Sequence, residues 1–481
     1  MSAKSKYYMH LGISLLFMFC FGFLPAIDPI TPYGMRILGI FIGTLYGWIA
    51  TGNLIWPSIF CWLALGTTTS FSTVPQILAS LFSNSTLILI MAMLMFASAI
   101  NTSGLGVNIS HAMISSKALH GRPWALSITI FVATFVSAMF ISVIAAFIIC
   151  FEFVYSISKQ VGYKPRDTWP AMMLSGVIFA GCLGQSVLPY KPGVTACYGM
   201  LMAANPGMSF QFNEYFVFAL LFSILAMILF ILICKFVIRP DMSKFTDSDY
   251  KLEDVPPMDA KKKFTAFLTI LLVGLLLIPS FLPSDWAFVQ FLNGIGTAGL
   301  AFFVVAIAVL VKDKDGNNYL EMKEISKGVS WDLILMIGTA LTIGPALSGA
   351  ETGVRTVFVN LLMPLANGDG GAYIFTVVLL LITLVGTNFI NNAVMNAILV
   401  PVLATVWMTV GVNPVGVVAL ISLLSGIAML FPSASPAGAI LSGAKDWISQ
   451  KQITTYSIIA MISGFAITLF AIPIAEMMFT M

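Results

Sequence analysis

A few polar side chains interrupt segments of this chain that are otherwise apolar. Asn391 and Asn392 lie in a run, residues 370–444, that contains no Asp, Glu, Lys or Arg, and Lys191 is the one charged residue within residues 169–204. These groups include no nucleophile–base pair, no metal-ligand spacing and no phosphate-binding glycine loop. The pattern therefore predicts binding of a polar solute or ion, and predicts that the protein is not an enzyme.

The composition places these groups in a membrane. The 481 residues are 59% hydrophobic and 9% charged, with a mean hydropathy of +0.98, whereas a soluble domain carries about 25% charged residues. Residues 37–116 and 370–444 are uncharged, and each run is several times the ~20 residues that cross a bilayer. We therefore predict an all-α polytopic membrane protein and exclude soluble enzymes, disordered chains and secreted disulfide scaffolds. A β-barrel is excluded because its strands alternate apolar and polar residues.

The apolar segments divide into two similar series. Residues 1–32 contain a first helix, residues 33–238 and 264–481 are predicted to form two repeats, and the charged residues 239–263 are predicted to form a cytoplasmic linker. Together they predict about 11 transmembrane helices. In each repeat, three helices precede a hairpin, a helix broken by Gly and Pro, and a long closing helix.

The positions of Lys and Arg predict how the segments cross the bilayer, because basic residues collect in short cytoplasmic loops. With the N-terminus in the cytoplasm, segments about 124–156 and 371–409 must each enter the membrane and return as re-entrant hairpins. All 23 basic residues except Arg36, Lys191 and Arg355 then lie on the cytoplasmic face, and the C-terminus lies outside. The two repeats face opposite ways, which is an inverted repeat typical of secondary transporters.

Each repeat also contains a helix that is interrupted at membrane depth. The segments are about 169–204, with Tyr190-Lys191-Pro192-Gly193 at the break, and about 414–444, with Ser435-Pro436-Ala437-Gly438. Irregular backbone is tolerated at this depth only where it is buried or lines a cavity. The two hairpin tips and the two breaks therefore predict one central site.

At the tips and breaks the sequence resembles the divalent anion–sodium symporter family, the di- and tricarboxylate and sulfate carriers of the ion transporter superfamily. In that family each tip carries a Ser-Asn-Thr triplet and each break a Thr-Pro-Pro-Asn-like run. The second tip places Asn392 at the triplet's Asn, between Asn391 and Ala393. The first tip keeps Ser142 and continues with Val143-Ile144, so this chain is a divergent member by its motifs.

The resemblance implies a secondary active carrier of a small anion, such as a dicarboxylate, driven by sodium symport or by exchange through an elevator-like movement. It also implies a homodimer in a lipid bilayer, which we expect to be a bacterial inner membrane. Apart from sodium, no cofactor is expected, and a net charge of +3 gives no indication of a nucleic-acid partner. The substrate-binding residues that it implies are Ser142, Asn391, Asn392, Ser435 and Pro436, and we add Lys191 because it is the one charged residue of the first broken helix. The cation-binding residues that it implies are Ser142, Gly184, Thr387, Ile390, Asn392 and Ala434.

Lys191 has two interpretations. In one, its ammonium supplies positive charge that a bound sodium supplies in relatives, which would lower the sodium stoichiometry or produce an exchanger. In the other, Lys191 lies nearer the outer end of its helix and extends to the membrane surface. The clustered Asn residues could likewise join helices by hydrogen bonds instead of binding a solute.

Two further classes of function remain as alternatives to a coupled carrier. An anion channel would expose a continuous pore with selectivity rings, usually repeated by oligomeric symmetry. A carrier for another small solute, uncoupled from sodium, would share the predicted fold. Saturable flux with counterflow distinguishes both carriers from the channel.

Overall fold

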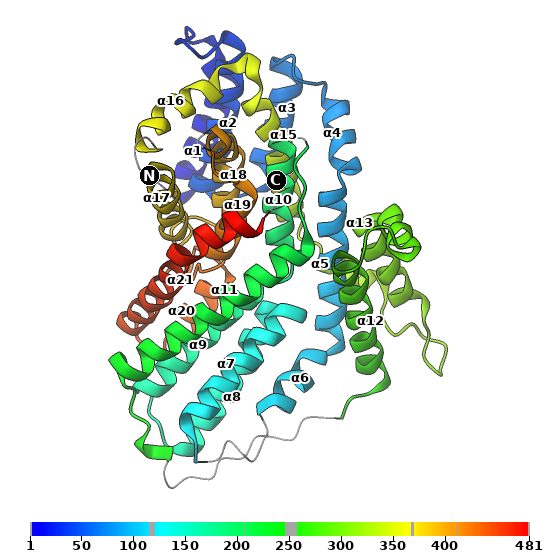
Figure 1. Ribbon diagram of the computed structural model, residues 1–481, viewed down its shortest axis with the longest axis vertical. Helices are drawn as coiled ribbons and strands as arrows, with labels where there is room; N and C mark the ends of the chain where they lie inside the picture. Colours follow the sequence, from blue (N-terminus) through cyan, green and yellow to red (C-terminus); the bar gives the residue numbers. More distant parts are fainter. Residues whose placement is uncertain are drawn as a thin grey trace.

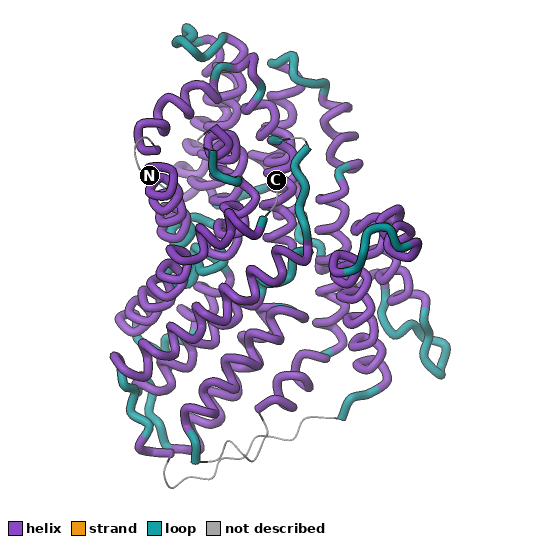
Figure 2. Tube along the Cα trace, viewed as in Figure 1, coloured by secondary structure: helices purple, strands orange, loops and turns teal. Residues whose placement is uncertain are grey.

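The computed structural model describes residues 2–114, 121–205, 207–245, 257–366, 370–409 and 411–479. Within these ranges the regular secondary structure is helical, apart from one isolated bridge between Lys312 and Asn318. The helices pack into one elongated body (Figures 1 and 2). Eleven of the described helices are long and apolar enough to cross a membrane. The prediction of an all-α membrane protein with about 11 spans is confirmed.

After α1 (Ala3–Cys20), two series of ten helices follow one another in a similar order. The first series comprises α2 (Pro32–Thr51), α3 (Ile55–Thr68), α4 (Val74–Ser83), α5 (Ser85–Ser103), α6 (Leu105–Ile114), α7 (Pro123–Phe140), α8 (Val143–Val161), α9 (Thr168–Gly184), α10 (Pro192–Ala204) and α11 (Phe212–Ile233). The second comprises α12 (Ala260–Leu277), α13 (Ala287–Leu310), α14 (Met322–Ile325), α15 (Trp331–Ser348), α16 (Val354–Ala366), α17 (Gly371–Gly386), α18 (Asn392–Thr409), α19 (Pro414–Ser425), α20 (Pro436–Gly443) and α21 (Gln450–Met478).

The two series pack against each other reciprocally. Helix α5 lies against α13, and α15 lies against α3, so the third long helix of each series contacts the second of the other. Helices α12 and α13 form one side of the molecule beside α5 (Figure 1). The closing helices α11 and α21 also pack together. Neither series therefore completes its packing alone.

Helices α7 and α8 form an antiparallel pair. They are joined by Ile141 and Ser142 alone. The Trp169 indole donates to the Ser127 hydroxyl near the start of α7, at 3.1 Å, and its ring stacks on Tyr163 just beyond the end of α8. The open end of the pair is thus fixed beside α9. Helix α8 runs five residues beyond the predicted hairpin end because the left-handed Gly162 is the residue that caps it.

Helices α17 and α18 form the second pair, over the residues predicted for the second hairpin. Phe375 near the start of α17 and Trp407 near the end of α18 lie edge to face, with ring centroids 6.5 Å apart. The connection between these helices, residues 387–391, has five residues where the first pair has two. The second tip is therefore larger and contains more polar groups.

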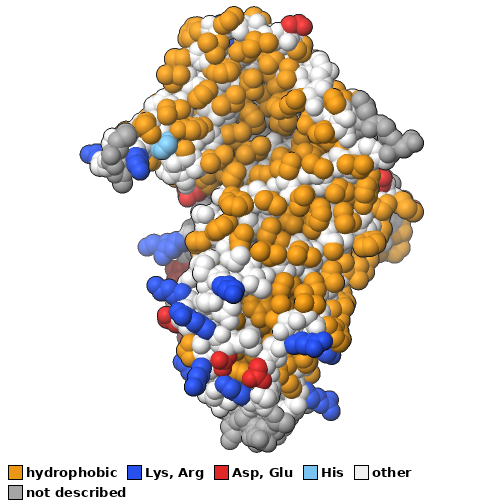
Figure 3. Space-filling view, turned by 90° about the vertical axis from the view of Figure 1, so that its left-hand side faces the viewer, with side chains coloured by type: hydrophobic (Ala, Val, Ile, Leu, Met, Phe, Trp, Pro, Cys, Tyr) orange, Lys and Arg blue, Asp and Glu red, His pale blue; other side chains and the backbone are white. Residues whose placement is uncertain are grey.

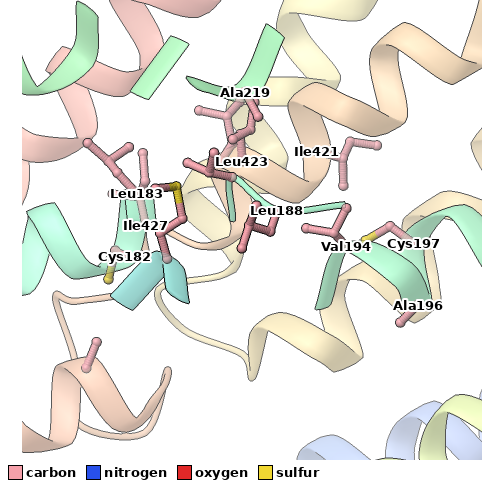
Figure 4. Close-up of a cluster of buried hydrophobic side chains, with 14 of the residues drawn as sticks. Cys182, Leu183, Leu188, Val194, Ala196, Cys197, Ala219, Ile421, Leu423 and Ile427 are labelled. Atoms are coloured by element: carbon pink, nitrogen blue, oxygen red, sulfur yellow. The ribbon is translucent and has the colours of Figure 1, made fainter. Parts of the chain in front are cut away.

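The two interrupted helices cross at the centre of the molecule. The first is α9 and α10 with residues 185–191 between them, and the second is α19 and α20 with residues 426–435 between them. Each second segment begins with proline, which suits the first helical position because it needs no N–H there. Apolar side chains from α9, α10, α11, α19 and the first break fill the crossing, among them Leu183, Leu188 and Leu423 (Figure 4). The breaks are thus held by a packed core.

Charge is concentrated at one end of the molecule. In the face drawn in Figure 3 the centre and upper part are mostly apolar, while Lys and Arg gather on the lower part. At this end the Lys244 ammonium pairs with the Asp167 carboxylate at 2.9 Å, which joins the start of the predicted linker to the loop between α8 and α9. Linker residues 246–256 lie outside the described residues.

Candidate functional site

A cavity of about 270 Å³ lies between the two pairs and the two interrupted helices. It lies just below the ~300–1,000 Å³ typical of pockets for drug-sized ligands, so it suits a small solute. The first tip, the first break and the start of α18 beside the second tip line it, and the second break contributes Gly426. Ser435 and Pro436, the residues predicted at the second break, are not among the lining residues. Helices α5 and α12 add apolar side chains, including Phe96, Ile100 and Leu272.

Three helix N-termini open onto this cavity. They are the start of α8 at Ser142 and Val143, the start of α10 at residues 191–194, and the start of α18 at Asn392 and Ala393. The first N–H groups of a helix have no partner within the helix and carry partial positive charge. The Ser142 hydroxyl also makes no hydrogen bond within the part of the chain that the structure describes. The cavity therefore offers donors and positive potential, which suit an anion.

Lys191 adds a full positive charge to the same wall. Its Nζ donates to the main-chain oxygens of Ala138, at 3.0 Å, and Ile141, at 3.2 Å, at the C-terminal end of α7. An ammonium group has three N–H donors, and these carbonyls use two of them. Lys191 therefore lies at the first tip, as the interpretation that gives its ammonium a role in the site requires.

The second tip is tied to the second break by one buried amide. Asn388 Nδ2 donates to Leu384 O at 2.9 Å and to Ile427 O at 3.0 Å. Its Oδ1 accepts from the N–H groups of Met429, at 3.0 Å, and Leu430, at 2.9 Å. The fully buried side chain thus uses every hydrogen of its amide and holds two irregular segments in register.

A set of oxygen atoms lies at the second tip. Thr387 Oγ1 donates to Ser425 O at 3.0 Å, which leaves its lone pairs available. The main-chain oxygens of Thr387 and Ile390 accept no hydrogen bond from any described residue. No hydrogen bond joins the Asn392 side chain to the described residues either. Neutral oxygen donors of this kind suit a hard cation, so the chemistry of this set fits sodium.

The predicted site residues separate into three groups. Ser142, Lys191 and Asn392 line the cavity. Thr387 and Ile390 contribute to the oxygen set beside it, and Ala434 is buried in the second break.

The remaining predicted residues shape the backbone. Asn391 and Ser435 cap their own helices, Asn391 through Ala393 N and Ser435 through two N–H groups that follow Pro436. Gly184 packs against α7, where a Cβ would collide with the main-chain oxygen of Phe135. Its role in the structure is therefore close helix packing.

Sequence reasoning missed three residues of this site. Asn388 lies three residues before the positions that match the family triplet, so nothing in the motif indicated it. Tyr190 and Asn396 line the cavity, and their Oη and Oδ1 atoms are buried with no partner among the described residues. The signal for both was available, because Tyr190 adjoins Lys191 and Asn396 follows Asn392 by one helical turn.

The family comparison can be set against this geometry. The family model described as "Sodium:sulfate symporter transmembrane region" matches residues 5–481. The chain belongs to this family. The resemblance inferred from the tips and breaks is confirmed.

Two relatives of this symporter-family chain illustrate its distance from characterised proteins. It is 30% identical over 122 residues to rabbit (Oryctolagus cuniculus) solute carrier family 13 member 2, over 25% of this chain and 20% of that protein. It is 22% identical over 327 residues to the sodium-dependent dicarboxylate transporter SdcS of Staphylococcus saprophyticus, over 65% of this chain and 62% of that protein. Each match spans less than two thirds of the relative's length.

Solved transporter structures share the fold. The YdaH transporter of Alcanivorax borkumensis aligns with a TM-score of 0.59 and 16% identity, covering 83% of this chain and 88% of YdaH. Neisseria gonorrhoeae MtrF, from a class described as antimetabolite efflux pumps, aligns with a TM-score of 0.61 and 10% identity, covering 97% of this chain and 94% of MtrF. At these identities the likeness concerns the fold alone.

Proposed function

We propose that this protein is a secondary active transporter that carries a small dicarboxylate together with sodium. The observation that carries the proposal is the convergence of three helix N-termini and the Lys191 ammonium on one small cavity. Positive potential of this kind recognises carboxylate oxygens. The dicarboxylate named for the staphylococcal relative is consistent with this chemistry.

The cavity walls favour a dicarboxylate over sulfate. Phe96, Ile100 and Leu272 bring apolar surface to the cavity. Apolar walls with a few placed polar groups suit a ligand that has a hydrocarbon centre, which sulfate lacks. Sodium would bind at the oxygen set of Thr387, Ile390 and Asn392, beside the anion, so that each ligand stabilises the other.

Alternating access would come from a moving bundle, α7–α11 and α17–α21, which contains both pairs and both interrupted helices. Helices α2, α3, α5, α12, α13 and α15 would form the stationary scaffold, and the reciprocal packing of α5 with α13 and α3 with α15 supports this division. The two series would form an inverted repeat, and the antiparallel pairs would be re-entrant hairpins. We further propose a homodimer formed through the scaffold, in a bacterial inner membrane, with the N-terminus and the linker cytoplasmic and the C-terminus outside.

Uptake by the purified protein in proteoliposomes tests the function. Labelled four-carbon dicarboxylates, citrate and sulfate are supplied separately under a sodium gradient, a proton gradient or preloaded counter-substrate. Saturable, sodium-stimulated dicarboxylate uptake with counterflow is expected. Sulfate uptake without dicarboxylate uptake would refute the proposed substrate, sodium-independent flux would refute the coupling, and single-channel currents would indicate a pore.

A further inference from the structure

The two tips and breaks contain corresponding positions. Lys191 and Ser435 are the capping residues of α10 and α20, and each is followed by proline. Ser142 and Asn391 immediately precede α8 and α18, and the main-chain oxygen of each accepts from the N–H four residues later, at 2.9 Å. Lys191 therefore corresponds to Ser435, and Ser142 to Asn391.

Counting back along the chain from Ser142 and from Asn391 shows which main-chain carbonyl groups of the two tips correspond. Ala138 and Ile141 lie four residues and one residue before Ser142, as Thr387 and Ile390 do before Asn391. In the first series the Lys191 ammonium binds both carbonyl oxygens, at 3.0 and 3.2 Å. In the second series the equivalent oxygens accept no hydrogen bond from the described residues.

Other side chains follow the same asymmetry. The Ser435 hydroxyl bonds to Ala428 O and to the N–H groups of its own helix, so it does not occupy the carbonyl pair. The first position of α18 is Asn392, which has a side-chain oxygen, whereas the first position of α8 is Val143, which has none. The first series thus contains a cation, the Lys191 ammonium, and lacks the side-chain oxygen ligand. The second series contains that ligand, at Asn392, and has no ammonium at the equivalent position.

From this asymmetry we infer that the Lys191 ammonium is a built-in cation of the first series, and that the protein binds one sodium ion, in the second series only. The inference rests on the proposed sodium-coupled transport. With a dicarboxylate bound, the charges of Lys191 and one sodium neutralise the two carboxylates. The empty site retains the lysine charge, and an uncompensated charge at membrane depth is unfavourable. Exchange of one dicarboxylate for another is therefore faster than net uptake.

The number of sodium ions is measured in two ways on the wild-type protein. Labelled sodium bound at saturation is counted per chain in detergent, and labelled sodium and dicarboxylate are counted together during uptake. One ion per chain and one per dicarboxylate are expected. One dicarboxylate with one sodium carries a net charge of −1, so an inside-negative potential set with potassium and valinomycin should slow uptake.

A designed exchange of residues tests the cause. Lys191→Ser with Val143→Asn gives the first series the ligands of the second, and should raise bound sodium to two per chain and make uptake insensitive to potential. Ser435→Lys places an ammonium beside the second carbonyl pair and should reduce bound sodium to zero. Lys445→Met, at an exposed lysine, is the matched control and should bind one sodium.

The outcomes separate the inference from the proposed function. Wild-type protein that takes up dicarboxylate with two or more sodium ions, or faster at inside-negative potential, overturns the inference and leaves the function intact. Two bound ions per wild-type chain, or none, overturn it even if the substrate is another anion. If the double variant does not fold, the wild-type sodium count and voltage response still decide.

Discussion

The main-chain N–H of Leu430 donates to the side-chain oxygen of Asn388 at 2.9 Å. Asn388 lies in the second tip and Leu430 in the second break, 42 positions apart in the sequence. A single amide thus fixes the second tip against the second break, where no regular backbone pairing exists. The oxygen set of Thr387 and Ile390 depends on this contact for its geometry.

Replacing Asn388 should therefore destabilise the second tip more than any exposed polar substitution. Asn388→Ala removes the partner of two buried carbonyls, of the buried Met429 N–H and of the half-buried Leu430 N–H. Each buried group left without a partner costs about 1–3 kcal/mol. We expect a loss of about 3 kcal/mol or more, measured by thermal unfolding in detergent. Asn391→Ala, which removes one capping bond, is the control and should cost about 1 kcal/mol. Equal effects would show that Asn388 does not join the segments.

Sodium dependence should rely on the Thr387 hydroxyl. Thr387→Ala removes a proposed sodium ligand, and we expect the sodium concentration for half-maximal uptake to rise about tenfold, equivalent to about 1.4 kcal/mol. Thr387→Ser should restore it. Thr376→Ala is the matched control because Thr376 is also fully buried in this region and bonds only within its own helix. An unchanged sodium response in Thr387→Ala and in Asn392→Ala would refute the second-series site.

Two glycines of the first interrupted helix should differ in how much stability the protein loses on substitution by alanine. In Gly184→Ala the new Cβ meets the main-chain oxygen of Phe135 and the Cβ of Ala138, so α7 must shift, at a cost of about 1–3 kcal/mol. Gly193→Ala adds a methyl group to open space and should change stability by less than about 1 kcal/mol. Unfolding temperatures of both variants provide the comparison. Similar values would exclude tight packing at Gly184.

Acid should weaken the contact between the linker and the α8–α9 loop. The hydrogen bond from Lys244, followed by that from the Lys164 N–H, lowers the pKa of the Asp167 carboxyl below its ordinary value of 3.8. A lowered pKa in the folded state stabilises the protein above the ordinary carboxyl pKa, and this stabilisation is lost as the pH falls through the folded-state pKa.

The test compares the unfolding temperatures of wild type and Asp167→Asn across this pH range. We expect a difference of at most about 1 kcal/mol at neutral pH, because the pair is one third exposed. The difference should begin to shrink as the pH falls below about 4 and should disappear once the pH is below the folded-state pKa. Asp446→Asn, at an exposed carboxylate in the same region, is the control and should show no such loss. A difference that persists in acid would exclude the Asp167 charge as its cause.

Sequence patterns predicted the fold well because the length of an apolar segment, and the positions of Lys and Arg around it, are properties of whole segments and do not depend on individual contacts. The pairs and interrupted helices lie where the uncharged runs, Gly and Pro placed them, within a few residues. Residues such as Ser142 and Asn392 were found because a tip must end one helix and begin another, which leaves polar groups at its bend.

Contacts between the tips and breaks could not be predicted in the same way. Gly184 lies next to the first break, where a ligand-binding residue was expected, and in the structure it packs against the main-chain oxygen of Phe135. The role of Asn388 depends on a tertiary contact between residues 388 and 430, which the sequence does not indicate. Whether Lys191 reached Ile141 or the membrane surface depended on the rotation of α10, which periodicity does not determine.

The shared lining of the cavity has a consequence for synthesis in the cell. Ser142 and Lys191 are translated long before Asn392 and Ser425, which complete the same wall. A nascent chain that ended after α11 would have Lys191 in an incomplete cavity. It would also expose the face of α3 that α15 covers and the face of α5 that α13 covers. Production of the polypeptide as two separate fragments, divided within residues 246–256, should yield active carrier only when both are made together.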